Sequence, residues 1–363
     1  MKLKKIALPF KVNKPILAFG AAAKNTLCFA KRGFAYLSPV HTDLSQPCDF
    51  SIFENEAKSF LRRKPKIIAY DLHPDYPSSK FALALDPARF NLFPVQHHHA
   101  HIASCMAENG LVNQKVIGVA FDGTGMGSDN SIWGAEFLIC DYGNYQRRAH
   151  LKEIPLLGAE KAIQQPWRLA CAWLDFQFFP RQYQRQCRIL KKIARQKFHF
   201  PMASSMGRLF DAVGSLVLKK YQVKQEAELA IALEKIASRY KAPGKPYNFK
   251  ILNKQNQYII DPGLMFRQVL ADLKAKTAKE KIAYRFHHTI AKMIAETCLI
   301  LRKNSGINRV ALSGGVFQNK LLLALSLELL CNAGFKVVIH KDLSSSDASI
   351  SLGQAAVANF FRR

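Results

Sequence analysis

The sequence predicts an α/β protein made of two related lobes, the second of which carries a helical insertion. Short apolar runs typical of buried strands begin both parts of the chain, and helical spacing of apolar residues fills the insertion, about residues 160–300. Alternation of strands and helices returns near the C-terminus. We expect a first lobe at residues 1–115, a second lobe at 116–349, and a C-terminal helix, 350–363, that packs back on the first lobe.

One strand–loop–strand unit occurs twice in the chain. Residues 16–30 are expected to form a buried strand, a turn of small residues and a second strand. Residues 116–139 repeat this order, with the glycine-rich loop 122–127 in place of the turn. The repetition is the pattern expected of a duplicated, actin-like (ASKHA) nucleotide fold, in which paired hairpin loops from two lobes face one cleft. Two unrelated hairpins would give the same pattern, and this feature alone does not decide between the two interpretations.

The remaining elements follow from local spacing. In the insertion, apolar residues at three- and four-residue intervals predict helices at residues 167–174, 205–218, 225–240 and 286–303. Residues 243–246 and 253–257 are expected to form loops or a small hairpin. The C-terminal part is expected to form a strand at 310–312, a Gly-Gly turn, a helix from Asn319, a strand at 336–339 and a helix from Ile350.

The composition is that of a globular protein, with 49% hydrophobic and 22% charged residues in a chain of 363. Lys and Arg outnumber Asp and Glu by 53 to 26, which gives a formal net charge of +27. Such a field attracts anions, but charge alone does not choose among nucleotides, acidic proteins, RNA and membrane surfaces. No basic run is interleaved with an aromatic RNA-binding motif, so nucleic acid stays an open partner but not the favoured one.

The eight cysteines are scattered, and no two of them form the CxxC pair of a zinc ribbon or finger. The sequence shows no secretion signal and no apolar run of about 18 residues that would span a membrane. We therefore predict a cytoplasmic protein with free, reduced thiols and no membrane partner.

Four histidines lie within residues 97–101, at the start of an expected helix. His97 and His101 are four residues apart and share one helix face, with Cβ atoms about 5–6 Å apart. Two imidazoles so placed can bind one divalent metal ion. His98 and His99 point elsewhere, and we expect them to support the site or to lie at the surface. A role without metal is the alternative for a histidine pair; the density of histidines favours a metal site but does not name the metal.

Three further segments can complete such a site. Asp122 ends a buried strand and precedes glycines that allow close approach to an anion, although Asp-Gly is also common in tight hairpins. Gly314 and Gly315 follow a strand, where backbone N–H groups can meet a nucleotide or the chain can simply turn. Asp347 precedes a helix, where a carboxylate is usually an N-cap. It becomes a metal ligand only if the fold brings it to the histidines.

A set of longer motifs resembles one known family. In chain order they are DLHPDY (71–76), VQHHHAHIAS (95–104), FDGTGMG (121–127), IWGAEF (132–137), EKAIQQPWRLA (160–170), SSMGRLFDAVGSL (204–216), LSGGVFQN (312–319) and SLGQA (351–355). Together they resemble the transferase module of the HypF family of hydrogenase-maturation proteins, over about residues 15–358. That module is related to the tRNA threonylcarbamoyl transferases and the antibiotic O-carbamoyltransferases, which share an actin-like two-lobe fold.

The resemblance implies a carbamoyltransferase. Carbamoyl adenylate, made from carbamoyl phosphate and ATP, would bind in the cleft and pass its carbamoyl group to the C-terminal cysteine thiol of the partner HypE. The implied ligands of a divalent metal are His97, His101, Asp122 and Asp347. Two nitrogens and two oxygens suit iron(II), zinc or manganese better than calcium.

The resemblance also implies which residues surround the bound nucleotide, which would be ATP, AMP or carbamoyl adenylate. Gly314, Gly315 and Asn319 should border the adenosine, with Gly207 in the same region, and Asp211 and Glu226 should bind the ribose hydroxyls. Lys24 and Lys161 are further candidates for phosphate contacts. His73 is a candidate near the acceptor.

Several features depart from the family's pattern. Ala348-Ser349 replaces a usual Gly-Gly after Asp347, Gln164 stands at a usual arginine, and Gln225 to Ala230 replaces a Tyr-Glu-x-Gln-Ala-Ala run. The family's adenylate-forming domain has no counterpart in this sequence, so we expect a separate protein, related to the N-terminal part of HypF or to YrdC, to supply the adenylate. The alternatives are transfer to a small-molecule hydroxyl or to tRNA, and a non-catalytic remnant that binds nucleotide and metal.

Overall fold

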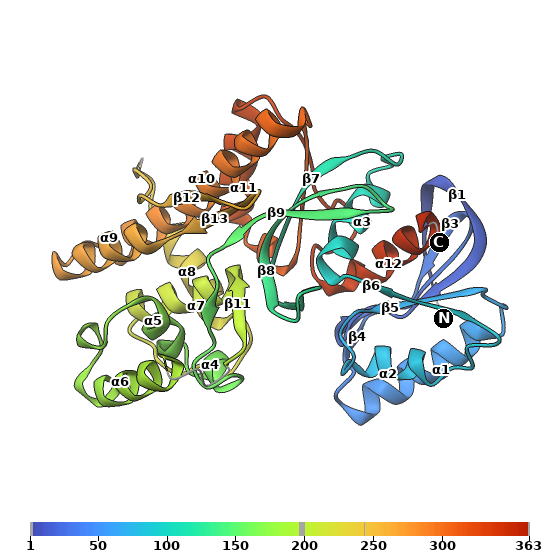
Figure 1. Ribbon diagram of the computed structural model, residues 1–363, viewed down its shortest axis with the longest axis horizontal. Helices are drawn as coiled ribbons and strands as arrows, with labels where there is room; N and C mark the ends of the chain where they lie inside the picture. The colour runs from blue at the N-terminus through green and yellow to red at the C-terminus, as the bar shows by residue number, and fades with distance from the viewer. Residues whose placement is uncertain (1–2, 196–199, 243, 362–363) are drawn as a thin grey trace.

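The computed structural model describes residues 3–195, 200–242 and 244–361. Within these ranges the strands form a four-stranded sheet, a nine-stranded sheet and a separate two-stranded ribbon. The molecule is elongated, with the four-stranded sheet at one end, the nine-stranded sheet near the middle and a group of helices at the other end (Figure 1). Pro243, in a predicted loop, and residues 362–363, in the predicted C-terminal helix, lie outside the described residues.

The four-stranded sheet has, in spatial order, strands β3 (Cys28–Leu37), β1 (Lys4–Ala18), β5 (Ile67–Asp71) and β6 (Asn91–Val95). Successive side chains of a strand point to opposite faces of the sheet. Accordingly Ile16 and Ala18 of β1 join one apolar cluster, while Leu17 joins another that contains phenylalanines of helix α1 (Pro47–Leu61). Helix α2 (Pro77–Leu83) follows β5, and the two-stranded ribbon pairs β2 (Ala23–Asn25) with β4 (His41–Asp43).

The nine-stranded sheet is built around β7 (Val116–Met126), which pairs antiparallel with β8 (Ile132–Cys140) and parallel with β14 (Arg309–Ser313). The carboxyl ends of adjacent parallel strands lie at the same sheet edge, so Asp122 and the Ser-Gly-Gly turn are brought together. The other strands are β9 (Tyr145–Leu151), β10 (Ile154–Pro155), β11 (Met202–Ser205), β12 (Lys250–Lys254), β13 (Gln257–Asp261) and β15 (Lys336–Val338).

Two helices lie between the sheets (Figure 1): α3 (His97–Glu108) and α12 (Ile350–Phe360). One apolar cluster combines their residues with residues of both sheets. The helices touch where Gly353 meets Ala100, because a Cβ on Gly353 would lie 1.8 Å from the Ala100 carbonyl oxygen. The C-terminal helix thus packs against α3 and against β1. The division of the chain into lobes at residue 115 stays a prediction.

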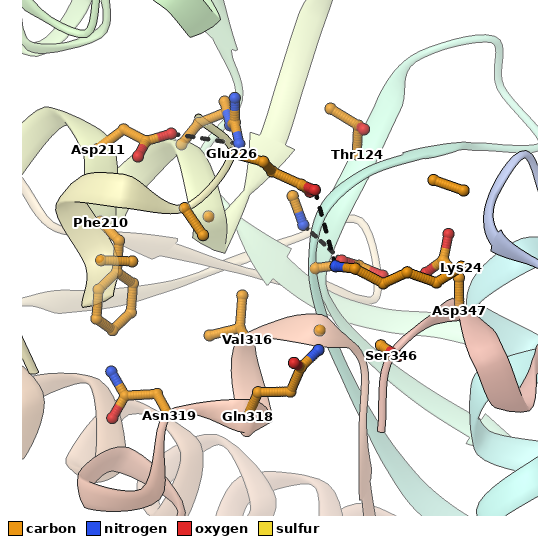
Figure 2. Close-up of a pocket in the computed structure, with 18 of the residues that line it drawn as sticks. Lys24, Thr124, Phe210, Asp211, Glu226, Val316, Gln318, Asn319, Ser346 and Asp347 are labelled. Carbon is orange, nitrogen blue, oxygen red and sulfur yellow. Dashed lines mark hydrogen bonds and ion pairs between the residues drawn. The ribbon is translucent and has the colours of Figure 1, made fainter. Parts of the chain in front are cut away.

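The other face of the large sheet is covered by helices that share its second large core. Helices α7 (Met206–Val217) and α8 (Glu228–Ala237) border a cleft, part of which Figure 2 shows. Helix α10 (Lys279–Ser305) ends at Gly306, which takes the left-handed conformation common at helix ends. The remaining helices are α4 (Lys161–Gln164), α5 (Trp167–Trp173), α6 (Arg181–Arg195), α9 (Gly263–Lys274) and α11 (Lys320–Asn332).

Several local predictions were wrong. The glycine-rich segment 122–127 is mostly not a loop, because β7 continues to Met126 after a shift in its pairing with β8 between Phe121 and Gly125. The insertion is not purely helical, since it supplies β11, β12 and β13 to the large sheet. The helix predicted at 225–240 begins only at Glu228, after Ala227 in the left-handed region. The small hairpin predicted around residues 253–257 is confirmed by β12 and β13.

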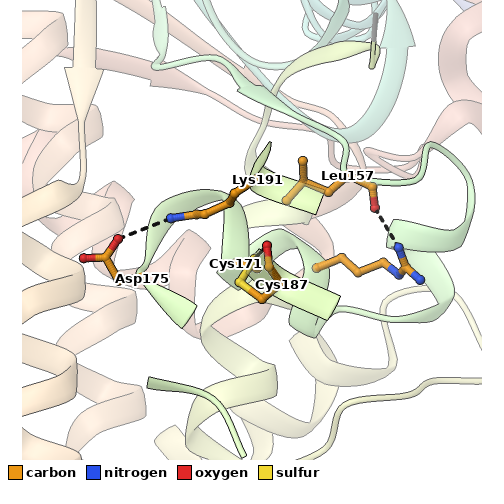
Figure 3. Close-up of a disulfide and its surroundings, with 6 residues drawn as sticks. Leu157, Cys171, Asp175, Cys187 and Lys191 are labelled. Atoms are coloured by element: carbon orange, nitrogen blue, oxygen red, sulfur yellow. Dashed lines mark hydrogen bonds and ion pairs between the residues drawn. A yellow bond between two sulfur atoms is a disulfide. The ribbon is translucent and has the colours of Figure 1, made fainter. Parts of the chain in front are cut away.

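The prediction of free thiols was wrong for one pair. Cys171 on α5 and Cys187 on α6 form a disulfide, shown in Figure 3. The two cysteines are 16 residues apart and form no CxxC motif, so the local sequence does not predict the bond. The fold places the two residues together. The other described cysteines are free: Cys28, Cys48, Cys105, Cys140, Cys298 and Cys331.

Within the described ranges, no helix combines the length and the apolar character that crossing a bilayer requires. The cytoplasmic location stays a prediction.

Candidate metal and nucleotide site

Helix α3 carries both histidines of the predicted pair. Gln96 caps its N-terminus by accepting a hydrogen bond from the His99 backbone N–H at 2.8 Å. His97 and His101 are fully buried, and their ring centroids lie 5.1 Å apart. His98 and His99 are also buried, so the surface placement considered for them is wrong, and His99 bonds the Asp141 carbonyl at 2.6 Å. The close packing of α3 on α12 fixes the face that the pair presents.

Asp122 and Asp347 converge on this pair. Each of the four side chains offers one ligand atom, and these atoms all lie within 4.8 Å of one another. The His101 Nε2 lies 2.9 Å from Asp122 Oδ2 and 3.6 Å from Asp347 Oδ1, and His97 Nε2 lies 3.7 and 3.9 Å from the same two atoms. The carboxylates are part-buried, with 13% and 24% of their side chains exposed. Two imidazole nitrogens and two carboxylate oxygens therefore surround one point.

The Asp71 carboxylate orients the His97 ring through the ring nitrogen that faces away from the cluster. Its Nδ1 lies 2.8 Å from Oδ2 of the fully buried Asp71, to which it donates. Among the described residues, the opposite nitrogen, Nε2, is buried and has no hydrogen-bond partner. A carboxylate behind a histidine is the usual outer support of a metal-binding imidazole, because it fixes the tautomer whose free lone pair faces the ion. The residues present thus fit a divalent metal ion.

The pKa directions agree with this fit. Burial alone would lower the pKa of His97, but Asp71, Asp122 and Asp347 together raise it well above its usual value. Burial likewise opposes charge on His101, whose pKa is nevertheless raised by Asp122 and Asp347. Burial would raise the pKa of Asp122, yet the hydrogen bond from His101 and the positive charges of His101 and His97 hold it well below the usual range. The cluster therefore favours bound positive charge, which protons or a metal cation can supply.

Asp122 and Asp347 line a cleft of about 340 Å³. Ala22, Ala23, Lys24 and Tyr76 line it from the first 115 residues, and the other walls come from later in the chain (Figure 2). Of the predicted nucleotide residues, those that line the cleft are Gly207, Asp211, Glu226, Gly315 and Asn319.

Three predicted residues do not line the cleft. Gly314 lies behind Gly315 with φ +105°, where a Cβ would come 2.2 Å from the Phe121 carbonyl oxygen. Lys161 is exposed on α4. His73 stacks on Tyr76 with ring centroids 4.3 Å apart, so it contacts a wall residue from outside.

Small residues let the backbone form the cleft wall. A Cβ on Gly207 would lie 2.8 Å from the Gly123 Cα, so the start of α7 crosses β7 in direct backbone contact. Ser205 caps α7 and also donates to the carbonyls of Asp122 and Gly123. This junction holds Asp122 against the wall that carries Asp211.

Asp211 pairs with a residue that sequence reasoning missed. Arg208 Nη2 lies 3.3 Å from Asp211 Oδ2, and both side chains are almost buried. Burial raises the pKa of Asp211, with Arg208 opposing the rise and Glu226 adding to it. Two other guanidinium nitrogens of Arg208, Nε and Nη1, are buried without a hydrogen-bond partner in the described chain. Arg208 lines the cleft, but these two nitrogens are enclosed by the protein.

Asn319 is fixed by a buried histidine. Its Oδ1 caps α11 by accepting from the Leu322 backbone N–H, and its Nδ2 donates to His287 Nε2 at 3.0 Å. His287 Nδ1 donates to the Ala283 carbonyl at 2.7 Å. Burial lowers the pKa of His287 to about 4, so the ring is neutral and can accept this bond.

Asp71 and Tyr76 were also missed as site residues, although both lie in the quoted DLHPDY motif. Asp71 ends β5, beside β6, which leads directly into α3. The rule that side chains after parallel strands meet at one sheet edge would have placed Asp71 near His97. Burial and the charges of Asp71, Asp347 and Asp122 raise the pKa of Tyr76, so its hydroxyl stays protonated as a donor.

Comparison with known proteins supports the same reading of the chain. The family model described as "HypF Kae1-like domain" matches residues 11–108, and the one described as "Carbamoyltransferase, Kae1-like Domain, second subdomain" matches residues 118–354. The chain is similar to "Carbamoyltransferase HypF" of Synechocystis, with 36% identity over 96% of this chain and 48% of the relative. It is also 32% identical to "Carbamoyltransferase HypF homolog" of Cupriavidus necator, over 95% of this chain and 91% of the relative.

Solved structures give the same answer. A full-length HypF "in the phosphate- and nucleotide-bound form" is 38% identical, with a TM-score of 0.92 over 98% of this chain and 47% of that one. The structure of "T.kodakarensis HypF" is 28% identical, with a TM-score of 0.86 over 98% of this chain and 49% of that one. The chain spans about half the length of the full-length relatives that it matches. The predicted α/β, actin-like fold is confirmed, and the chain belongs to the Kae1-like carbamoyltransferase domains of the HypF family.

Proposed function

We propose that this chain transfers a carbamoyl group from carbamoyl adenylate to the C-terminal cysteine thiol of a HypE-like protein, in the maturation of nickel–iron hydrogenase. The observation that carries the proposal is the convergence of four ligand atoms within 4.8 Å, beside a 340 Å³ cleft that two of these residues, Asp122 and Asp347, line. The relatives named carbamoyltransferase, and the related structure described as phosphate- and nucleotide-bound, support it.

His97, His101, Asp122 and Asp347 would hold the metal, for which iron(II), zinc or manganese suits the nitrogen and oxygen donors. When bound, a divalent ion at this position stabilises the negative charge of a departing phosphate oxygen. The usual Gly-Gly after Asp347 is not needed for this geometry, because Ser349 takes φ −102° and Asp347 still reaches the histidines.

The adenylate would lie along the wall formed by α7, α8 and the turn after β14. Asp211 and Glu226 would accept hydrogen bonds from the ribose hydroxyls, while Gly207, Gly314, Gly315 and Asn319 shape the adenosine end. Lys24 would contact a phosphate from the opposite wall, and Arg208, which also lines the cleft, would place its positive charge beside the ligand. Lys161 and His73 lie outside this arrangement, Lys161 because it is exposed on α4.

The acceptor would supply the nucleophile. No cysteine of the described chain lines the cleft, and burial raises the pKa of Cys28, Cys105, Cys140 and Cys298. In the transfer, the acceptor sulfur bonds to the carbamoyl carbon as the carbon–oxygen bond to AMP breaks, and the thiol proton passes to water. Tyr76, protonated at the cleft wall, can donate a hydrogen bond to the carbamoyl or phosphate oxygen. A separate YrdC-like protein would provide the adenylate.

The test is to incubate the purified protein with synthetic carbamoyl adenylate and a peptide that ends in cysteine. We expect the peptide to gain one carbamoyl group by mass spectrometry, and a matched peptide ending in serine to gain none. The His97→Ala protein should lose metal and transfer together. Normal transfer by that variant would refute the metal assignment.

The other two readings are outcomes of the same experiment. Transfer to small alcohols or to tRNA, but not to the thiol, would replace the acceptor. Nucleotide and metal binding without transfer to any acceptor would favour a non-catalytic binding protein.

A further inference from the structure

A chain of hydrogen bonds leads away from the metal cluster, starting at the Nδ1 of His101. The His101 Nδ1 lies 3.4 Å from Ser313 Oγ, and Ser313 Oγ lies 2.9 Å from His340 Nε2. His340 Nδ1 in turn lies 2.6 Å from Glu108 Oε2. Four residues from α3, the end of β14 and the segment after β15 thus form one continuous path.

The chemistry of each group sets the direction of this path. His101 must keep its Nε2 lone pair free for an ion, so its Nδ1 carries the hydrogen and donates to Ser313. The Ser313 hydroxyl then donates to His340 Nε2, which leaves the Nδ1–H of His340 to donate to Glu108. Every link has one donor and one acceptor, and the path ends on a carboxylate, as the single link from His97 to Asp71 does.

Glu108 also holds a second part of the site. Its other oxygen, Oε1, accepts from the backbone N–H groups of Lys341, Asp342 and Leu343 at 3.1, 2.6 and 2.7 Å. The next residue on α3's C-terminal side, Asn109, donates to the Ile339 carbonyl at 2.8 Å. These bonds fix the start of the segment that leads to Asp347. One helix therefore carries two of the cluster residues and holds the segment that carries a third.

The residues of this path are buried, which makes their hydrogen bonds energetically important. The side chains of His340 and Glu108 are 3% and 4% exposed, and Ser313 is fully buried. A buried carboxylate is costly unless its oxygens accept several hydrogen bonds, and Glu108 accepts four. The buried pair of Glu108 and His340 does not by itself indicate a role in stability, because apolar residues of similar volume often give the same stability. The position of this pair behind His101, a candidate metal ligand, indicates a different role.

We infer that Glu108, His340 and Ser313 are positioning residues of the metal site, which fix the tautomer of His101 and hold the segment that carries Asp347. This inference rests on the proposed function, because it needs a metal ion at the cluster. The path is an outer support for His101, separate from the one that Asp71 gives to His97.

The test measures binding of Zn²⁺ alone to tag-free protein, by competition with a chromophoric chelator. Ser313→Ala cuts the path without touching Glu108, and it should weaken Zn²⁺ binding by about 10-fold, the lower end of the effect of outer-shell changes. The matched control is Ser326→Ala, which removes another fully buried hydroxyl that bonds only the Leu322 carbonyl. The control should bind Zn²⁺ like the unaltered protein, and AMP affinity measured without metal should not change in either variant.

A second pair of variants tests the path at His340. The His340→Ala variant should also weaken Zn²⁺ binding, whereas His340→Gln should recover most of it, since an amide can accept from Ser313 and donate to Glu108. Recovery by the amide separates positioning from a general loss of packing.

The outcomes distinguish the two proposals. If Ser313→Ala binds Zn²⁺ normally while His97→Ala does not, the path has no positioning role and the metal site stands. If His97→Ala also binds normally, the metal site and the path both fall. Equal losses in Ser313→Ala and Ser326→Ala would likewise overturn the inference, because the effect would then be general loosening of the core.

Discussion

The two ends of the cleft are built differently. At the end proposed to hold the metal (the metal end), His97 and His101 are fully buried, and each has a hydrogen-bond partner outside the cleft, Asp71 for one and Ser313 for the other. At the end proposed to bind the nucleotide (the nucleotide end), Glu226 is 68% exposed, and its ion pair with Lys24 is long, at 3.8 Å. The metal end is thus organised by residues behind it, while the nucleotide end depends more on the ligand itself.

This difference teaches where a substitution should act. Changes behind the metal end should alter the affinity for the ion even though they remove no ligand atom. Changes at the nucleotide end should alter nucleotide affinity and leave the fold almost untouched. The four predictions below test this comparison of the two ends. They run from the largest expected effect to the smallest.

The strongest effect is expected for Asp71→Asn. The amide cannot hold the His97 ring with a charged acceptor, so Zn²⁺ affinity should fall by 10- to 100-fold, as is typical for outer-shell partners. Chelator competition measures the change. Asp75→Asn is the matched control, since Asp75 is largely exposed and pairs only with Lys80 at the surface. Equal affinities for the Asp71 variant and the unaltered protein would show that the metal end needs no support.

Low pH should reduce the stability of the fold through two buried, neutral histidines. His99 lies on α3 at the metal end, and His287 bonds Asn319 at the nucleotide end. Burial lowers the pKa of each to about 4, against about 6.5 when unfolded. Between these pKa values the unfolded chain therefore binds more protons than the folded chain. The free energy of unfolding falls as the pH drops from 6.5 towards 4. Between pH 7 and pH 5 each histidine should cost about 2 kcal/mol.

Urea unfolding at pH 7 and pH 5 measures this loss. The His287→Gln protein should lose less stability between these pH values than the unaltered protein does, because one of the two groups no longer titrates. An identical pH dependence in both proteins would contradict the assignment for His287.

A smaller effect is expected for Arg208→Lys at the nucleotide end. Lysine keeps a positive charge near Asp211 but loses the planar guanidinium that sets the position of this charge at the cleft wall. AMP affinity should fall by about 10-fold, close to the contribution of one hydrogen bond to a charged group. Calorimetric titration with AMP measures it. A parallel loss of Zn²⁺ affinity would break the separation between the two ends.

The smallest effect is expected for Lys24→Ala. Its ion pair with Glu226 is largely exposed, so the free energy of unfolding should change by less than about 0.5 kcal/mol. Urea unfolding checks the stability, and AMP titration should show weaker binding if Lys24 contacts a phosphate. A stability loss of several kcal/mol would mean that this pair holds the two walls together.

The sequence predicted the metal end better than the nucleotide end. The spacing of His97 and His101 fixes them on one helix face, and Asp122 follows a readily recognised buried strand. Asp347 could be joined to them only through the family resemblance, because local spacing carries no information about contacts between residues so far apart. The Asp71 carboxylate was missed because a strand-end acid followed by a turn has an ordinary local explanation.

At the nucleotide end the errors come from long-range packing. Arg208 belongs to a motif whose local explanation, a capped helix start, is also true, and only the fold shows its buried, unpaired N–H groups. Lys161 was assigned to the cleft from its motif, yet the short helix α4 leaves it exposed. Segment 122–127 has loop composition, but cross-strand pairing with β8 overrides it.

The close contact between Gly353 and Ala100 has a consequence for the order in which the protein matures. Helix α12 follows α3 by more than 200 residues, and it packs directly on this helix, which carries the histidines. During synthesis, α3 can therefore reach its final packing only after α12 has left the ribosome, and Asp347 can join the histidines only then. A fragment cut short of residue 347 lacks one of the four candidate ligands and should bind a metal ion weakly.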